Sequence, residues 1–305
     1  MNDQEFKEKY DNLKNSKFYQ QKMFGWRPLP TISCITIIFV CFAVFFIIMG
    51  IIILVFTAQV KEIKYKYYHC EKSPCHYGDK IIDINEDMKK PVMIYYQVDG
   101  VIQNHRFYMD SKSDKQLKGE KVTYDDLKKD KICESALTED QMKNWYGYGD
   151  DDDENLADPC GLISKTFLKE EFSNWRKDGV KLKDEELEEE GIAYQSDIDT
   201  YEEGVASRDD YGEHFLVWMR ISPFSNPRKL WGRINTDLKQ NSKLEINIKP
   251  DSSYYFGNRY IILSTRNIFG GKSMFLGICY IIAGGLSLMA SVIFITTYSS
   301  FHSKN

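Results

Sequence analysis

Two long apolar segments lie near the two ends of the chain, and a densely charged segment lies between them. No charged side chain occurs from Pro28 to Val60, and none occurs from Ser273 to Ser303. Each segment exceeds the roughly 20 residues that an α-helix needs to cross the bilayer core. The pattern therefore predicts five parts: an N-terminal tail (1–30), a first transmembrane helix (31–58), a large domain outside the membrane (59–272), a second transmembrane helix (273–298) and a C-terminal tail (299–305).

The middle segment carries the patterns of β-strands. Leu244–Ile248 alternates apolar and polar side chains, which is typical of a half-buried strand. Val92–Val98, Phe215–Ile221 and Tyr260–Ser264 are β-branched and aromatic runs of strand length. These runs predict a mainly-β domain.

Helical patterns are fewer and shorter. Leu168, Phe172 and Trp175 recur at helical spacing, and residues 181–190 form a charged helix or a solvated loop. We therefore expect two transmembrane α-helices flanking an antiparallel β-sandwich with helical insertions.

The charge excludes one class of partner. The chain has a formal net charge of −5, and because the N-terminal tail is basic, the middle domain is acidic. Nucleic-acid binding needs a basic surface that releases counterions from phosphates. We therefore expect no nucleic-acid partner.

The cysteines indicate on which side of the membrane the domain lies. Lysines and arginines flank the first span on both sides, so the positive-inside rule favours neither orientation of the span clearly. Three of the seven cysteines lie in the spans, and four lie in the domain, which allows two disulfides in three connectivities or four reduced thiols. We favour disulfides, which place the domain on the exoplasmic side and both termini in the cytosol. The domain cysteines are Cys70, Cys75, Cys133 and Cys160.

No catalytic motif stands out. The five histidines belong to no nucleophile–base pattern, phosphate loop or zinc-protease helix. His69-Cys70 and Cys75-His76 could ligate zinc, but a small disulfide loop is the simpler interpretation. The acidic run Asp150–Glu154 lacks the spacing of a calcium loop and is interpreted as a solvated loop. We expect no catalytic residue, metal or cofactor, and an ectoenzyme stays a third-ranked hypothesis.

The second apolar segment carries a stripe of small residues. Small residues let another helix backbone approach closely in lipid, where no hydrophobic effect drives association. The partner of this stripe is either the first span of the same chain or a larger membrane protein. We take the following residues as candidate docking positions: Gly277, Cys279, Ala283, Ser287 and Ser291 in the stripe, with Trp26 before the first span.

A set of short motifs, in one order along the chain, resembles the "cell division control protein 50" family, the accessory β-subunits of type IV P-type ATPases. The motifs are Tyr95-Tyr96, Gln103-Asn104-His105-Arg106, Tyr108, Ser111, Gln116-Leu117, Pro159-Cys160-Gly161, Gly191-Ile192-Ala193, Asp197, Phe215-x-Val217-Trp218-Met219-Arg220, Arg228-Lys229-Leu230, Arg233-Ile234, Ile262-Leu263-Ser264-Thr265, Gly270-Gly271-Lys272 and Phe275-Leu276-Gly277, together with Phe18, Gln20-Gln21, Trp26 and Pro28 before the first span.

The resemblance implies a non-catalytic subunit of a phospholipid flippase. Such a subunit forms a heterodimer with the ATPase, is needed for its folding and exit from the endoplasmic reticulum, and supports its transport cycle among membrane lipids. It implies residence from the endoplasmic reticulum to the Golgi, endosomes or plasma membrane. It also implies a disulfide between Cys133 and Cys160, and it places Cys70 and Cys75 where members carry membrane-proximal cysteines.

Two departures and one alternative accompany the resemblance. Family domains usually carry N-linked glycans, yet this chain has no Asn-x-Ser/Thr sequence, and its membrane-proximal region has two cysteines where some members have four.

The alternative function is a two-span, homo-oligomeric ligand-gated or acid-sensing-type channel subunit. Channels of that kind carry more cysteines in the domain, and neither span here has a charged side chain.

Overall fold

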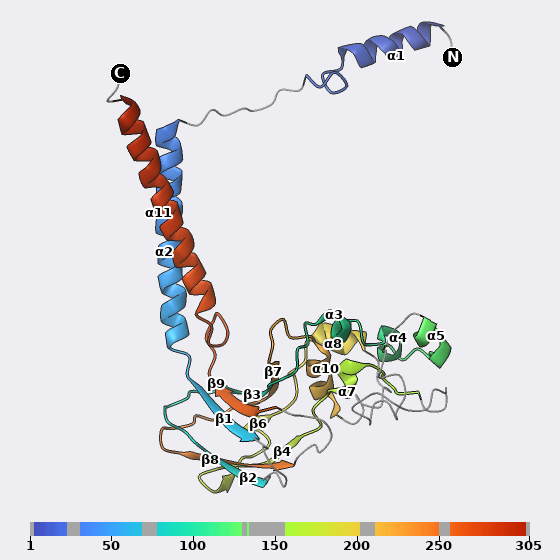
Figure 1. The fold of residues 1–305 in the computed structure, drawn as a ribbon, viewed down its shortest axis with the longest axis vertical. Coiled ribbons are helices and arrows are strands. Elements are labelled where there is room, and N and C mark those ends of the chain that lie inside the picture. The colour runs from blue at the N-terminus through green and yellow to red at the C-terminus, as the bar shows by residue number, and fades with distance from the viewer. Residues whose placement is uncertain are drawn as a thin grey trace. The chain divides into compact units, whose positions relative to one another are not determined.

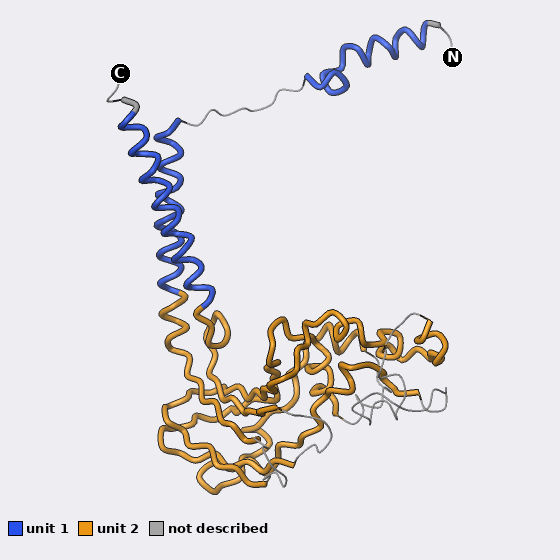
Figure 2. The backbone as a smooth tube through the Cα atoms, in the orientation of Figure 1, with its two compact units in different colours: residues 1–52, 275–305 blue, residues 53–274 orange. Residues whose placement is uncertain are grey.

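The computed structural model describes residues 3–22, 31–68, 78–129, 133, 156–201, 211–249 and 257–302. The chain divides into two units, residues 1–52 with 275–305 and residues 53–274 (Figure 2). Trp26, Cys70, Cys75 and the acidic run at 150–154 lie outside the described residues, and so do the hypotheses that depend on them.

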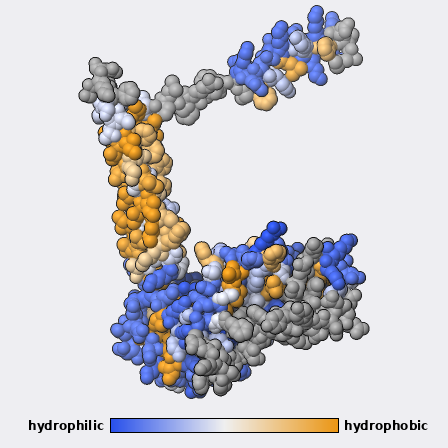
Figure 3. All heavy atoms as spheres, viewed as in Figure 1, coloured by the Kyte–Doolittle hydropathy of each residue, from blue (hydrophilic) through white to orange (hydrophobic). Residues whose placement is uncertain are grey.

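The first unit consists of helices. A short amphipathic helix, α1 (Asp3–Asn15), precedes α2 (Ile32–Ala58), whose last turns belong to the second unit, and α11 (Phe275–His302) closes the chain. Apolar side chains cover the surface of α2 and α11 (Figure 3). Both helices are long and apolar enough to cross a membrane, over Ile32–Ala58 and Phe275–Ser300.

The second unit contains two antiparallel sheets (Figure 1). The first, sheet A, has the order β1 (Glu62–Tyr68), β9 (Arg259–Ser264), β3 (Val92–Val98), β7 (Arg228–Ile234) and β6 (Leu187–Glu188). The second, sheet B, has the order β2 (Gly78–Asp83), β8 (Lys243–Lys249), β4 (Glu171–Lys177) and β5 (Val180–Lys181).

The core of this unit lies between the two sheets. Ile94 and Trp231 from sheet A belong to the same buried cluster as Ile82 and Leu244 from sheet B. The ring of Phe172 in sheet B contacts the ring of Trp231 in sheet A, with centroids 5.5 Å apart. Alternate side chains of each strand therefore meet across the sheets, which is the packing of a β-sandwich.

Short helices are inserted between the strands. They are α3 (Arg106–Met109), α4 (Asp114–Leu117), α5 (Tyr124–Lys129), α7 (Leu162–Lys165), α8 (Gln195–Thr200) and α10 (Glu213–Met219). The structure thus shows the expected class, with two apolar helices flanking a mainly-β domain that has helical insertions.

One predicted strand is a helix. Phe215–Ile221 is an aromatic and β-branched run, but the structure places α10 over Glu213–Met219. The helix buries Phe215, Leu216, Trp218 and Met219, so that a short run of apolar residues is covered on most sides. A buried helix and a buried strand both show a continuous run of apolar residues in the sequence, so the pattern could not distinguish them. The strand prediction was wrong.

The reverse error occurs at Leu168, Phe172 and Trp175. Residues 171–177 form β4, and the register with β8 shifts between Ser173 and Arg176. Asn174 adopts a φ of 53° in this bulge. The extra residue lets Phe172 and Trp175 both face the core, so a bulge produces the spacing of three that we interpreted as helical. Residues 181–190, interpreted as a charged helix or loop, hold the end of β5, turns and β6.

Candidate functional site

The two apolar helices pack against each other through glycines. A Cβ atom on Gly284 of α11 would lie 3.1 Å from the carbonyl oxygen of Ala43 and 2.7 Å from Cγ1 of Ile47 on α2. A Cβ atom on Gly50 of α2 would lie 3.0 Å from the carbonyl oxygen of Gly277. Glycine therefore allows the two backbones to approach closely, as small residues do in membrane helix pairs.

Buried positions recur every seven residues on both helices. On α2, Ala43, Gly50 and Thr57 are buried at this spacing, with Ile53 buried between the last two, and on α11, Gly277, Gly284 and Ser291 are buried. The helices run antiparallel, with Ala43 level with Gly284 and Gly50 level with Gly277. A repeat of seven keeps one seam of each helix facing the other.

The predicted docking stripe divides between this seam and its border. Gly277 and Ser291 lie in the seam, where they face the chain's own first span. Cys279, Ala283 and Ser287 are half-buried at its border, and Ser287 Oγ donates to the carbonyl of Ala283 at 2.9 Å. The first of the two alternatives, pairing within the chain, therefore accounts for part of the stripe. The border residues remain candidates for an external helix.

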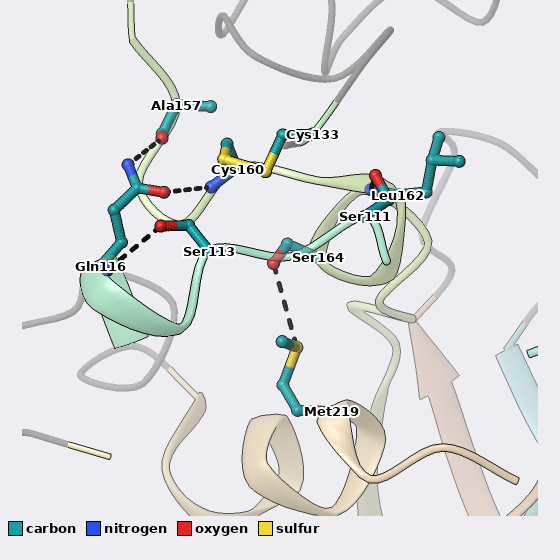
Figure 4. Close-up of a disulfide and its surroundings, with 9 residues drawn as sticks. All are labelled: Ser111, Ser113, Gln116, Cys133, Ala157, Cys160, Leu162, Ser164 and Met219. Carbon is teal, nitrogen blue, oxygen red and sulfur yellow. Dashed lines mark hydrogen bonds between the residues drawn. A yellow bond between two sulfur atoms is a disulfide. The ribbon is translucent and has the colours of Figure 1, made fainter. Parts of the chain in front are cut away.

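A disulfide joins Cys133 to Cys160, the pair that the resemblance implied, with Cα atoms 5.8 Å apart (Figure 4). The side chain of Gln116 connects this disulfide to α4. Its Oε1 accepts from the backbone N–H of Cys160 at 3.1 Å, and its Nε2 donates to the carbonyl of Ala157 at 2.9 Å. Ser113 caps α4 by accepting from the backbone N–H of Gln116. The disulfide therefore holds together segments far apart in the sequence.

Gly161, next to Cys160, cannot be replaced without a clash. It adopts a φ of 110°, and a Cβ atom there would overlap the carbonyl oxygen of Ser111. Ser111 Oγ in turn accepts from the backbone N–H of Leu162 at 2.9 Å. The motif residues Ser111, Gln116, Cys160 and Gly161 thus form one cluster, for which the sequence offered only the motif as a signal.

The disulfide leads to a direct chemical test. Alkylation of the unreduced, denatured protein should spare Cys133 and Cys160, because thiolates alone react. The protein is then reduced and treated with a second, isotopically distinct alkylating reagent. Mass spectrometry should find this second label on both Cys133 and Cys160. Cys34, Cys41 and Cys279, which are free thiols, provide the internal control for complete first labelling. Labelling of Cys133 and Cys160 by the first reagent, before reduction, would contradict the disulfide.

A second set of motif residues meets near α10. The carboxylate of Glu213 accepts from the backbone N–H groups of Gly191, Ile192 and Ala193, at 3.0, 2.7 and 2.8 Å. Burial acts to raise the pKa of Glu213, but these donors outweigh it and lower the pKa below its ordinary value. The turn at 191–193 is thereby fixed to the start of α10.

Polar motif residues also hold two loops of the domain together. Gln103 Oε1 accepts from the backbone N–H of Ser222 at 2.8 Å, and Asn104 Nδ2 donates to the carbonyl of Pro223 at 2.8 Å. Two large apolar side chains next to these contacts are exposed: Phe107 on α3, at 73%, and Phe224, at 77%. A contiguous exposed apolar patch is typical of a protein-binding surface, and we take Phe107 and Phe224 as candidate members of one.

Sequence reasoning missed a buried ion pair in the core. Arg259 on β9 forms a salt bridge with Glu170, just before β4, and the two side chains are 1% and 0% exposed. The hydroxyl of Tyr67 donates to the same carboxylate. Burial acts to lower the pKa of Arg259, but the negative charge of Glu170 outweighs it and raises the pKa. In the sequence, Glu170 is followed directly by a second glutamate, Glu171, and nothing in this pair predicts that Glu170 is buried.

A β-sandwich inserted between two apolar, membrane-length helices defines a two-span membrane protein with one large domain. Residues 5–304 match the LEM3 (ligand-effect modulator 3)/CDC50 family, and the chain belongs to this family.

Its relatives come from distant organisms. The chain is 28% identical to "ALA-interacting subunit 3" of Arabidopsis thaliana, over 93% of this chain and 86% of the relative. It is 26% identical to "Cell cycle control protein 50A" of Bos taurus, over 95% and 90%. It is 22% identical to "Phospholipid-transporting ATPase accessory subunit CRF1" of Saccharomyces cerevisiae, over 92% and 84%.

Proposed function

We propose that this chain is a non-catalytic β-subunit of a phospholipid flippase, which forms a heterodimer with a type IV P-type ATPase. It is needed for folding of that ATPase, for its exit from the endoplasmic reticulum and for its transport cycle. The observation that carries the proposal is the family match over residues 5–304, together with relatives that are named as accessory or interacting subunits.

The domain lies on the exoplasmic side, and both termini lie in the cytosol. The disulfide between Cys133 and Cys160 supports this orientation, because structural disulfides persist in the secretory lumen and at the cell exterior and are rare in the cytosol. The complex moves from the endoplasmic reticulum to the Golgi, endosomes or plasma membrane.

The subunit acts by contacts and not by chemistry. Two surfaces are available to the ATPase: the border of the helix seam at Cys279, Ala283 and Ser287, and the surface of the domain that exposes Phe107 and Phe224. Contacts that differ between conformers of the ATPase would shift their populations, which is how a subunit without an active site supports a transport cycle.

The first experiment is purification of the tagged chain in mild detergent, with the co-purifying proteins identified by mass spectrometry. A P-type ATPase at near-equal amount is the expected result. A homo-oligomer without a companion would contradict the proposal and favour the channel alternative, which electrophysiology would then test.

Ala283→Leu should reduce the amount of co-purifying ATPase severalfold without preventing membrane insertion. Ala283 is half-buried at the seam border, and a larger side chain there keeps a partner helix from approaching closely. The matched control is Val292→Leu, at a position 51% exposed on the same helix. Undiminished co-purification of Ala283→Leu would show that α11 does not dock through this border.

A further inference from the structure

Four motif segments of the chain surround one cavity of the domain. The cavity has a volume of about 510 Å³ and lies between the start of β7, α8 and the end of α10. Its polar lining includes the cations Arg220, Arg228 and Lys229 and the carboxylate of Asp197, and its aromatic lining consists of Tyr95 and Tyr194. The volume falls in the range of pockets that bind small molecules.

The two arginines of the cavity are neutralised by carboxylates. Arg220 contacts Asp197 through Nε at 3.0 Å and Nη2 at 3.2 Å, and its guanidinium lies 3.8 Å from the ring centroid of Tyr194. Arg228 Nη1 contacts Glu62 at 3.0 Å, and its guanidinium lies 4.5 Å from the ring centroid of Tyr95. Both side chains remain partly exposed, at 47% and 32%, so their other N–H groups stay accessible.

Lys229 is the cation of the cavity for which the structure describes no carboxylate partner. It is 5% exposed, and its ammonium donates to the backbone carbonyls of Trp218, at 3.2 Å, and Arg220. Among the residues that the structure describes, no carboxylate forms a salt bridge with it. Burial, with the positive charge of Arg220 adding to it, lowers the pKa of Lys229 to about 7.

We propose that this cavity binds a small ligand with one negative charge, a phosphate ester or a carboxylate, through Lys229 and the free N–H groups of Arg220 and Arg228. The anion supplies the missing counterion, and the rings of Tyr95 and Tyr194 pack against the organic part of the ligand. The ligand is either the headgroup of a phospholipid or a soluble anion, because both present the same chemistry. The site lies within the chain and does not depend on the proposed ATPase partner.

Binding should strengthen as the pH falls from 8 to 6. A bound anion stabilises the ammonium of Lys229, so binding takes up a proton near pH 7. Burial raises the pKa of the phenols of Tyr95 and Tyr96, so neither of them titrates in this window. Several titratable and charged groups lie on the elements around Lys229. Those groups are Glu62, Asp197, Tyr95, Tyr96, Tyr194, Arg220 and Arg228.

The test is calorimetric titration of the full chain in a maltoside detergent, which contains no phosphate. The probe is glycerophosphoglycerol, a phosphodiester that keeps its single charge from pH 6 to 8. Lys229→Met should weaken binding about tenfold and remove its pH dependence. Asp197→Asn, which frees Arg220, should tighten binding severalfold, and loss of folding cannot produce that gain.

Lys177→Met is the matched control, because Lys177 Nζ also donates to a backbone carbonyl, that of Asp237 at 2.7 Å, but lies on β4 outside the cavity. It should bind the probe as the wild type does. If Lys229→Met does not fold, Arg228→Gln and Asp197→Asn decide in its place, with expected weakening and tightening. Absence of saturable binding below about 10 mM, or equal affinities in wild type, Asp197→Asn and the tested cation variant, would overturn the proposal.

A second series identifies the source of the anion. The same titration is repeated in micelles that contain phosphatidylglycerol. Binding of the free probe that weakens as the phosphatidylglycerol content rises, and that reaches the same saturation at higher probe concentrations, indicates competition by a lipid headgroup at this cavity. Unchanged binding indicates a soluble anion. Either result supports the site.

Discussion

Glu170→Gln is expected to lower the free energy of unfolding of the domain by about 3–5 kcal/mol. The substitution keeps the size of the side chain but removes the negative charge with which the buried guanidinium of Arg259 forms a salt bridge. Because Arg259 lies on sheet A and Glu170 precedes β4 of sheet B, the loss falls on the contact between the two sheets.

The neighbouring residue provides the matched control. Glu171 is 61% exposed and pairs with Lys249, itself 65% exposed, at 2.6 Å. Exposed pairs contribute about 0–1 kcal/mol, so Glu171→Gln should be nearly neutral. Chemical unfolding of both variants in detergent, followed by tryptophan fluorescence, measures the difference. Equal stabilities would show that the buried pair does not hold the sheets together.

An apolar replacement of Glu170, Arg259 and Tyr67 distinguishes two effects: the cost of removing one partner of the ion pair, and the contribution of the ion pair itself to stability. Glu170→Leu combined with Arg259→Met and Tyr67→Phe removes these three polar groups together. Apolar residues of similar volume often replace a buried ion pair at little cost. The triple variant should therefore be more stable than Glu170→Gln. A triple variant that is less stable would mean that the pair itself is strongly stabilising.

Gly284→Leu is expected to separate the two membrane helices, whereas Gly285→Leu is not. At Gly284 even a Cβ atom would meet Ile47 and the backbone of Ala43, while at Gly285 no atom lies within 4 Å. The two variants have the same composition and the same hydropathy, so insertion into the membrane should be equal. Only the packing of α2 against α11 distinguishes them.

Spin labels at Ser33 and Thr297, both exposed positions on these helices, measure the separation after Cys34, Cys41 and Cys279 are replaced by alanine. Packed helices lie 8–10 Å apart, depending on the side chains at the contact. Gly284→Leu should lengthen the measured distance by about 2 Å or more and broaden its distribution. An unchanged distribution would contradict the glycine seam.

The sequence by itself determined the spans, the class of the domain and the family. Hydrophobicity summed over a membrane-length segment depends on composition alone, so the two long apolar helices, Ile32–Ala58 and Phe275–His302 in the structure, could be predicted without any contact. Strands with strict alternation or long β-branched runs, such as Leu244–Ile248 and Val92–Val98, were also correctly assigned, because their local pattern and their burial agree.

Only the tertiary structure decided which neighbours along the chain have different environments. Glu170 and Glu171, or Gly284 and Gly285, are equivalent in the sequence, yet one of each pair is buried against a distant segment. The same holds for Phe215–Met219, which is helical in a setting where α10 is covered on most sides, and for Arg220 and Arg228, whose partner carboxylates come from α8 and β1. The physical reason is that burial, charge pairing and close approach depend on contacts between residues far apart in the chain, which no local pattern records.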